Sequence, residues 1–409
     1  MERRATLASL LFMAWLVGTA FAQNINTPEN FPDPNFREAV EELIGVAHGG
    51  EFTAARATAI TGTLDCSFRA IEDMTGIEHL TGITGLDCSL NSLSKLDVSS
   101  NTALEELDCG SNRQLENLDV SRNMHLRRLN CEFDQLKNLN ISGCVALTEL
   151  RCEINQLTSL DASSCIALVD LWCGGNELTA LNVSGAAALR ELQCSDNQLT
   201  SLDVSTNAAL VSLACKNNQL TSLNVPNGAA LGVLVCGNNL LTSLDVLGSV
   251  ALKELRCSDN QIKLLNLSKN TALEVLVCSQ NHLTTLDVSA NTALTFLDCS
   301  KNQLINLDIS NNPDTKYLNC AFNQLTNLAS FVANQGLGEG DTVDVRNNLL
   351  GCDDWGAVQA LRTRIGEPVF SPLPPYSPNN EWLAGGFAYS PQNEIDPYDC
   401  TAASDWTFH

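Results

Sequence analysis

Cysteine is the residue type with the clearest potential for chemistry in this chain, because 17 are present and thirteen recur every 21 residues, apart from two intervals of 22. Cysteine side chains can form disulfides, bind metal ions or act as nucleophiles. A disulfide requires two Cβ atoms that face each other about 3.8 Å apart, however, whereas consecutive members of a regular column have parallel Cα–Cβ bonds. We call this column the cysteine ladder; it consists of Cys66, Cys88, Cys109, Cys131, Cys152, Cys173, Cys194, Cys215, Cys236, Cys257, Cys278, Cys299 and Cys320.

A metal site is also disfavoured for the cysteine ladder. The sequence has no C-x-x-C pair, and metal ligands must converge on one point instead of forming a row. We therefore expect buried free thiols that pack as small apolar side chains, with scattered disulfides as the alternative. Cys144 and Cys165 are also 21 residues apart, at a position where other repeats have asparagine. Unpaired thiols are expected there too, and an oxidised pair is the alternative.

The sequence has no grouping of residues that is typical of a conventional active site. The histidines are dispersed, no G-x-S-x-G, H-E-x-x-H or phosphate-loop motif occurs, and the carboxylates recur in columns. The sequence therefore predicts neither an enzyme nor a cofactor-binding protein. The five histidines are His48, His79, His125, His282 and His409.

The element that must position these side chains is a repeat, of which Leu189 to Leu210 is a representative copy. Its first half, L-x-x-L-x-C-x-x-N-x-L, matches the leucine-rich repeat consensus with cysteine in the sixth place. Its second half, x-x-L-x-V-x-x-N, alternates apolar and polar residues with the period of a strand. The predicted fold is mainly β: a right-handed leucine-rich-repeat solenoid with two short strands per 21-residue coil, a small helical N-terminal cap and a helical or irregular C-terminal cap.

The N-terminal region divides into a leader and a cap. Residues 1–22 combine two arginines, an apolar run and an A-x-A site, which predicts a signal peptide cleaved after Ala22 and a secreted, periplasmic or cell-surface protein. Residues 23–60 are expected to form a helical cap over the first coil, because a solenoid end exposes apolar surface. Asp33 is the predicted N-cap of its helix, Pro34 lies in the first turn and Gly45 ends it.

The remaining sequence contains the solenoid and a second cap. Residues 61–350 hold about 14 coils. Residues 351–409 are expected to form a C-terminal cap and a proline-rich tail. The cap helix is expected to open at residues 352–355, to stop at Gly366 and to carry Trp355, Val358, Leu361 and Ile365 on one stripe. Cys352 and Cys400 lie outside the ladder, and we predict a disulfide between them because the compartment is oxidising.

The charge of the chain excludes some classes of partner. Its formal net charge is −24, which repels the phosphates of nucleic acids and anionic lipid surfaces. After the leader, no apolar run is long enough to span a bilayer. The sequence therefore predicts no nucleic-acid binding and no membrane insertion, and leaves a protein or a glycan as the partner.

Three motifs carry a resemblance to a known family. The stretches FPDPNFREAVEEL and IEDMTGIEHL, and repeats of the form LDCSxNxLTSLDVSxNTAL, resemble the internalin-type bacterial surface proteins and the 21-residue class called IRREKO repeats. The resemblance covers about residues 30 to 350. It implies an adhesin-like recognition role without catalysis. No LPxTG motif or mucin-binding module is seen, so attachment and host target are not carried over from the family.

Recognition is expected on the outward positions that flank each L-x-C of the first half-repeats, because these columns vary most between coils. A tryptophan among arginines and carboxylates has the composition of an interface hot spot. This candidate face consists of Arg128, Asn130, Glu149, Arg151, Asp170, Trp172, Glu191 and Gln193. A second, apolar strip consists of Val233, Val235, Val275, Val277, Phe296 and Tyr317. The alternative for both sets is ordinary pairing of side chains between neighbouring strands.

Two columns of the second half-repeats suggest further alternatives. One alternates aspartate and asparagine from Asp119 to Asp287, and is expected to be a hydrogen-bonded exposed ladder, with a calcium-binding edge as the alternative. The other contains threonines from Thr158 to Thr242, which could contact ice or a polymer surface but also suit a strand. A structural, matrix or surface-spacing role is the main alternative to recognition.

Overall fold

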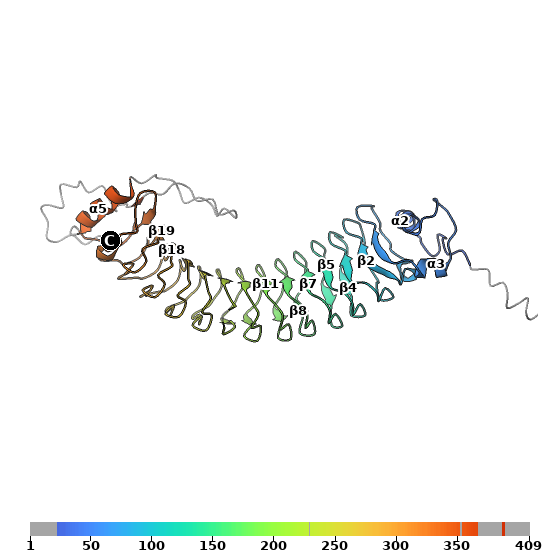
Figure 1. The fold of residues 1–409 in the computed structure, drawn as a ribbon, viewed down its shortest axis with the longest axis horizontal. Helices are drawn as coiled ribbons and strands as arrows, with labels where there is room; N and C mark the ends of the chain where they lie inside the picture. Colours follow the sequence, from blue (N-terminus) through green and yellow to red (C-terminus); the bar gives the residue numbers. More distant parts are fainter. Residues whose placement is uncertain (1–22, 229, 352–353, 367–386, 389–409) are drawn as a thin grey trace, which may run out of the picture. The chain divides into compact units, whose positions relative to one another are not determined.

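The computed structural model describes residues 23–228, 230–351, 354–366 and 387–388. The predicted signal peptide, the Cys352–Cys400 disulfide and most of the proline-rich tail lie outside these residues. The chain divides into two compact units, one up to Leu168 and the other from Val169 onward (Figure 1). The helices that the structure describes are all too short or too polar to span a lipid bilayer.

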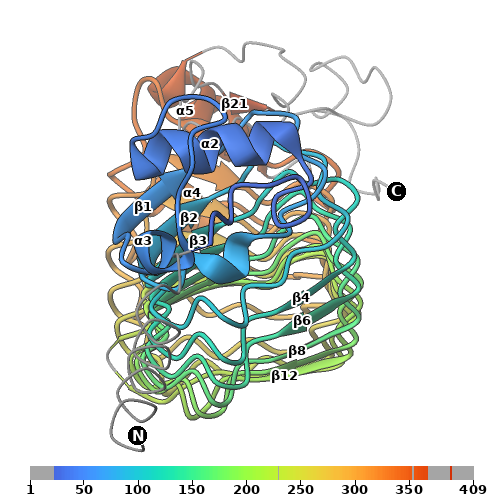
Figure 2. The ribbon, with the colours of Figure 1, turned by 90° about the vertical axis from the view of Figure 1, so that its right-hand side faces the viewer.

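The first unit begins with the predicted cap helix, α2 (Pro34–Ile44). The Asp33 carboxylate accepts hydrogen bonds from the backbone N–H groups of Asn35 (2.9 Å) and Phe36 (3.1 Å), and Gly45 ends the helix with a left-handed φ of 75°. The predicted helix and both of its capping residues are therefore confirmed. α2 contacts the first strand, and the short helices α3 (Ala54–Thr58) and η1 (Ile77–His79) contact each other (Figure 2).

Each coil of the first unit contributes one strand to a parallel sheet. The leucine at the centre of each strand pairs with the leucine one coil later, as in Leu86, Leu107, Leu129 and Leu150, so the 21- and 22-residue periods set the register. Inward side chains of one kind therefore stack on each other. The strands, in sheet order, are β1 (Gly62–Asp65), β2 (Ile83–Asp87), β3 (Glu106–Asp108), β5 (Arg128–Asn130) and β7 (Glu149–Arg151).

The second unit continues the same pattern. Its strands pair in parallel and in register, and they are β9 (Asp170–Trp172), β11 (Glu191–Gln193), β13 (Ser212–Ala214), β15 (Val233–Val235), β16 (Glu254–Arg256), β17 (Val275–Val277), β18 (Phe296–Asp298), β19 (Tyr317–Asn319), β20 (Thr342–Asp344) and β21 (Phe387–Ala388). The helices α4 (Ala329–Ala333) and α5 (Trp355–Ile365) contact each other. Val358, Leu361 and Ile365 are buried on one stripe of α5, which confirms that predicted helix.

The second strand of each coil is confined to part of the chain. It is present as β4 (Asn117–Asp119), β6 (Asn138–Asn140), β8 (Ser159–Asp161), β10 (Ala180–Asn182), β12 (Ser201–Asp203) and β14 (Ser222–Asn224). In the other coils that the structure describes, the second half forms no strand. Alternation of apolar and polar residues requires an extended chain with alternate side chains turned inward, but it does not bring the next coil within reach of N–H···O=C bonds.

The cysteine ladder lies in the core. Its members are buried, and Cys66, Cys194 and Cys257 are among those that are free thiols. Burial raises the pKa of the Cys194 and Cys257 thiols to about 12, so both remain protonated and unreactive at neutral pH. Cys109 Sγ donates to the carbonyl oxygen of Asn130 in the next coil at 3.5 Å. The ladder is therefore a packing and hydrogen-bonding column.

Asparagine ties the first corner of each coil to the coil before it. Asn197 Nδ2 donates to the carbonyl oxygens of Cys173 (3.0 Å) and Cys194 (3.1 Å), while its Oδ1 accepts from the backbone N–H of Leu178 (2.9 Å). The same Nδ2 lies 3.2 Å from the Ser195 carbonyl oxygen, so one buried amide satisfies four backbone groups at the corner. This column, three residues after each ladder cysteine from Cys88 onward, is the first asparagine column.

Asp134 departs from the first asparagine column. Its Oδ1 accepts from the backbone N–H of Asn112 at 2.5 Å, while its Oδ2 is buried without a hydrogen-bond partner. Burial raises the pKa of this carboxyl group to about 8. In the next coil, Asn155 Nδ2 donates to the carbonyl oxygens of Cys131 (2.8 Å) and Cys152 (3.2 Å). An ionised carboxylate has no proton to offer to carbonyl groups of this kind, so burial favours the neutral acid.

A second asparagine column ties the other corner. Asn207 Nδ2 donates to the carbonyl oxygens of Val183 (3.0 Å) and Ala186 (2.9 Å). Cys144 and Cys165 occupy this column as free thiols, as expected. Cys144 Sγ donates to the carbonyl oxygen of Val120 at 3.2 Å, so a thiol donor replaces the amide donor there.

Candidate recognition surface

Two columns of side chains point outward from the first-half strands. The first outward column contains the residue before each strand leucine, as Glu191 does, and the second contains the residue after it, as Gln193 does. The leucine between them is buried in every one of these strands, whereas the outward positions change from coil to coil. Variation beside a constant core allows a specific surface to be encoded without disturbing the fold.

The first unit holds four residues of the predicted face, and its charged members are paired. Arg128 on β5 forms an ion pair with Glu106 on β3, and Arg151 Nε lies 2.8 Å from Glu149 Oε1 within β7. Both arginines remain exposed at their outer ends. Exposed ion pairs contribute about 0–1 kcal/mol to stability, so these charges remain available to a partner at little cost.

Two carboxyl groups beside the same strands, those of Asp108 and Glu153, have pKa values raised by burial. Asn130 Nδ2 donates to Asp108 Oδ2 at 3.1 Å, and burial raises the pKa of Asp108. Burial also raises the pKa of Glu153, with a further contribution from the charge of Glu132. Glu153 Oε2 is buried and has no hydrogen-bond partner. This part of the first unit therefore favours the approach of a cation.

The second unit holds the other four residues of the predicted face. The strand register places Glu191 beside Asp170 and Gln193 beside Trp172. Trp172 is half-buried, and Gln193 Oε1 accepts from the backbone N–H of Ser195 at 3.0 Å. Trp172 therefore lies beside the side-chain amide of Gln193, which the backbone N–H of Ser195 orients. The carboxylates of Asp170 and Glu191 are neighbours of this pair.

The predicted apolar strip also lies in the second unit, and β16 divides it. Val233 and Val235 on β15 pair with Glu254 and Arg256, which form an ion pair with each other, before the strip resumes on β17. The sequence-based strip contained apolar residues alone and so omitted these two charges. Beyond the ion pair the strip contains Val275, Val277, Phe296 and Tyr317.

Two aromatic rings give this part of the strip a defined shape. Phe296 on β18 and Tyr317 on β19 stack with their ring centroids 4.2 Å apart and their planes at 4°. Both side chains are half-buried. Burial raises the pKa of the Tyr317 hydroxyl to about 12, and the charges of Asp298 and Asp344 add to that effect. The stack therefore has an apolar face beside a group of acids.

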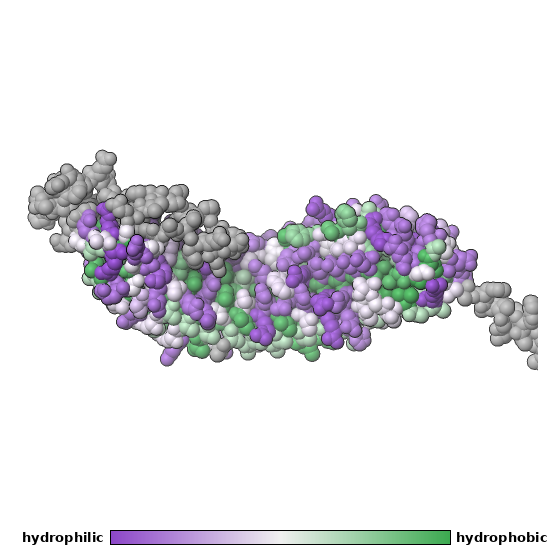
Figure 3. Space-filling view, turned by 45° about the horizontal axis from the view of Figure 1, so that its top comes forward, coloured by the Kyte–Doolittle hydropathy of each residue, from purple (hydrophilic) through white to green (hydrophobic). Residues whose placement is uncertain are grey.

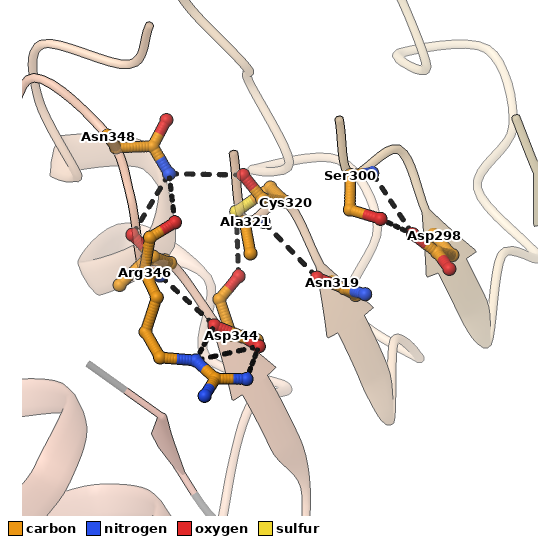
Figure 4. Close-up of polar contacts among 9 residues, drawn as sticks. Asp298, Ser300, Asn319, Cys320, Ala321, Asp344, Arg346 and Asn348 are labelled. Carbon is orange, nitrogen blue, oxygen red and sulfur yellow. Dashed lines mark hydrogen bonds and ion pairs between the residues drawn. The ribbon is translucent and has the colours of Figure 1, made fainter. Parts of the chain in front are cut away.

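The acids beside the stack lie in the second outward column (Figure 4). Asp298 accepts from the backbone N–H (3.0 Å) and hydroxyl (2.7 Å) of Ser300, and its burial raises its pKa. Asp344 accepts from Arg346 Nε (3.0 Å) and Nη2 (2.6 Å). Asp298, Asp344 and Arg346 were not in the predicted site, because the predicted strip contained apolar residues alone, although the sequence predicts one last coil at residues 343–345.

The aspartate–asparagine column of the second half-repeats forms a hydrogen-bonded ladder. Asp119 Oδ1 accepts from the backbone N–H of Ser121 (2.9 Å), and its Oδ2 accepts from Asn140 Nδ2 of the next coil (3.1 Å). The bonds from Ser121 lower the pKa of Asp119. Alternation therefore supplies an amide donor to a carboxylate. Among the described residues, no group of three His, Cys, Asp or Glu side chains could hold a metal ion.

Parallel coils with an inward L-x-C column and two asparagine corners define a leucine-rich-repeat solenoid. No protein-family model matches the chain. A stretch of 72 residues is 40% identical to internalin J of Listeria monocytogenes serotype 4b, and it covers 18% of this chain and 8% of that protein.

Solved structures extend the comparison over most of the chain. The functional domain of InlJ from Listeria monocytogenes, which includes a cysteine ladder, is 31% identical and matches over 78% of this chain and 81% of that domain, with a TM-score of 0.53. The chain therefore belongs to the internalin family of leucine-rich repeat proteins.

Two more distant structures share the fold alone. A leucine-rich repeat protein of Leptospira interrogans is 22% identical over 75% of this chain and 95% of that one, with a TM-score of 0.55. The internalin InlF of Listeria monocytogenes is 17% identical over 95% of this chain and 98% of that one, with a TM-score of 0.52.

Proposed function

We propose that this protein is an exported, non-catalytic recognition protein of the adhesin type, which binds a protein partner through the outward face of its first-half strands. The observation that carries the proposal is the stacked pair Phe296 and Tyr317 beside Asp298 and the Asp344–Arg346 ion pair. Stacked aromatics next to oriented charges have the composition of a binding hot spot. Membership of the internalin family supports the same role.

A partner-binding assay tests the proposal. The purified protein is immobilised, captured proteins are identified by mass spectrometry, and the affinity of each is then measured with purified components. The double variant Phe296→Ala with Tyr317→Ala should weaken binding of the partner about tenfold or more, because it removes the stacked apolar face. A matched control, Leu264→Ala with Ile305→Ala, removes exposed apolar side chains of the second half-repeats in the same unit and should leave the affinity unchanged.

The predicted face supplies a second pair of variants. Arg151→Ala and Trp172→Ala should each weaken the same complex without lowering the melting temperature by more than a few degrees. Unchanged affinity in all of these variants would remove the sheet face as the binding surface. Concentration-dependent filaments in the absence of a partner would favour the structural or matrix role instead, and binding confined to a glycan array would replace the protein partner with a glycan.

Export is a separate part of the proposal. The leader predicts that the mature protein starts at Gln23 and is found outside the cytoplasm. N-terminal sequencing of protein recovered from the culture medium, the periplasm and the cell surface tests this. An intact Met1 on all recovered protein would contradict it.

A further inference from the structure

The residue two positions after each ladder cysteine turns the corner at the end of the first-half strand. Every residue at this position, which we call the corner column, has a left-handed backbone, with φ between 52° and 66°. A left-handed conformation costs an L-residue about 1–2 kcal/mol, and Gly, Asn and Asp tolerate it best. In the first unit the corner column contains Phe68, Leu90, Ser111, Phe133 and Ile154.

The apolar residues of this column are exposed in addition to being strained. The exposed fractions are 82% for Phe68, 56% for Leu90, 46% for Phe133 and 50% for Ile154. A β-branched isoleucine with a positive φ is a genuine conformational outlier. The left-handed backbone disfavours these side chains, and they gain little from burial because they are exposed. Such outliers tend to occur at functional sites.

The second unit uses the same backbone position differently. From Gly175 to Lys301 its corner column is free of apolar side chains, and Asn217 Nδ2 donates to Asp196 Oδ1 at 2.6 Å while Asn238 Nδ2 donates to Asn217 Oδ1 at 2.9 Å. Phe322, 50% exposed, follows at the last position. The corner geometry therefore does not require apolar side chains. The corner residues in this range are Gly175, Asp196, Asn217, Asn238, Asp259, Gln280 and Lys301.

Successive coils place the corners of the first unit in a row, in which Ser111 separates Phe68 and Leu90 from Phe133 and Ile154. The backbone N–H of Phe68 donates to the Ser89 carbonyl (3.0 Å), that of Leu90 to Gly110 (2.9 Å) and that of Phe133 to Glu153 (3.0 Å). With about 4.8 Å between hydrogen-bonded strands, the row from Phe68 to Ile154 is about 20 Å long. We call Phe68, Leu90, Phe133 and Ile154 the corner ridge. Figure 3 shows apolar residues among hydrophilic ones on the face in view.

Carboxylates flank the corner ridge. Glu132 and Glu153 directly precede Phe133 and Ile154, and Asp65, Asp87 and Asp108 end the adjoining strands. Glu132 and Glu153 are only partly buried, so a donor on an incoming molecule can reach their carboxylate groups. At the position of Glu132 and Glu153, the coils of the second unit have glycine, serine, alanine or lysine and no acid.

We propose that the corner ridge binds a basic polypeptide segment, whose apolar side chains cover the ridge and whose lysine or arginine side chains reach Glu132 and Glu153. The negative charge of this protein determines which kind of molecule can occupy the corner ridge. A second copy of this chain carries a net charge of −24 and would be repelled, as would anionic lipid. This site lies on the coil corners and is independent of the sheet face proposed for the main partner.

Peptide binding to the purified protein tests the proposal. The probe is a labelled 11-residue peptide of alternating lysine and leucine, and its affinity is measured by fluorescence anisotropy at low and high salt. Peptides of alternating lysine and serine and of alternating glutamate and leucine serve as comparators. Binding of the lysine–leucine peptide should exceed that of either comparator by about tenfold or more, and should weaken with salt. The ridge is overturned if the wild type does not bind this peptide, or binds either comparator equally well.

Variants locate the site. Phe133→Asn with Ile154→Asn introduces the residue that the same column has at Asn217 and Asn238, so the fold should not be weakened, while affinity for the lysine–leucine peptide should fall about tenfold or more. Glu132→Gln with Glu153→Gln should reduce both the affinity and its salt dependence. Leu264→Asn with Ile305→Asn is the matched control. Wild-type affinity in the ridge variant, or equal loss in the control, contradicts the proposal, and retained binding by Phe296→Ala with Tyr317→Ala separates this site from the sheet face.

Discussion

The two units are built on one repeat, but they depart from it in different ways. In the first unit, Asp134 stands in the first asparagine column, Cys144 and Cys165 stand in the second, and apolar residues occupy the corners. In the second unit, the first asparagine column is unbroken from Asn176 to Asn323 and most corners are polar, although Ala186, Gly228 and Ser249 depart from the second asparagine column. The comparison separates residues that the coil needs from residues that it tolerates.

The first asparagine column shows what the coil needs. Asn197 satisfies four backbone groups with one amide, whereas Asp134 has a single hydrogen bond and one buried oxygen without a partner. Both side chains occupy the same place in the repeat and differ by one donor group. The difference in donor capacity, not the difference in size, should therefore decide how each affects stability.

The largest effect should follow from placing an acid in the regular unit. Asn197→Asp sets a carboxylate against the carbonyl oxygens of Cys173 and Cys194, and should lower the free energy of unfolding by about 3 kcal/mol at pH 7. Urea denaturation followed by circular dichroism measures it. Asn311→Asp at an exposed position is the control and should change little. Equal stability of the Asn197→Asp variant and the wild type would refute the role assigned to the amide.

The reverse change should stabilise the first unit. Asp134→Asn restores a donor and should raise the free energy of unfolding by about 2 kcal/mol at pH 8. Because burial raises the pKa of Asp134 from 3.8 to about 8, the folded state binds more protons than the unfolded state between these values. Wild-type stability should therefore fall as the pH rises from about 4 to 8, and the advantage of Asp134→Asn should disappear near pH 4. A pH-independent advantage would mean that Asp134 is ionised throughout.

The sequence predicted the repeat and its inward residues because both follow from periodicity. The ladder cysteines, the capping residues Asp33 and Gly45, and the thiols of Cys144 and Cys165 were all predicted from their positions in a pattern. The second-half strands were predicted in every coil but form in only part of the chain, because alternation determines the direction of a side chain and not the distance to the next coil.

The candidate surface was less accessible from the sequence. The columns were predicted from the repeat, but the ion pair of Glu254 and Arg256 within β16 was missed because the predicted strip contained apolar residues alone. The acids beside Tyr317 were missed because they depend on which coils are neighbours. The corner ridge was not predicted from the sequence. Phe133 and Ile154 have a left-handed φ, which phenylalanine and isoleucine normally avoid, so the residue type does not indicate this backbone conformation.

A smaller effect is expected from exchanging corner residues between the units. Ile154→Asn should raise the free energy of unfolding by about 1 kcal/mol, because asparagine tolerates the left-handed backbone, and Asn217→Ile should lower it by a similar amount. Chemical denaturation of both single variants provides the measurement. Ile166→Asn, at a position that is 62% exposed and outside the corner column, controls for the change from isoleucine to asparagine. If Ile154→Asn is destabilising, the corner isoleucine makes a contribution to the fold that its exposure conceals.

The smallest effect is expected at the second asparagine column. Cys144→Asn should raise the free energy of unfolding by about 0.5–1 kcal/mol, because the amide replaces one weak thiol donor with two stronger ones at a corner where Asn207 makes two such bonds. Cys144→Ala removes the donor and should be destabilising by about 1 kcal/mol, which makes it the matched control. Burial raises the pKa of the Cys144 thiol to about 12, so iodoacetamide should label it slowly in the folded protein at pH 8 and rapidly after unfolding. If Cys144→Asn is less stable than Cys144→Ala, the first unit is adapted to the smaller side chain, and its departures from the repeat are matched to one another instead of being independent.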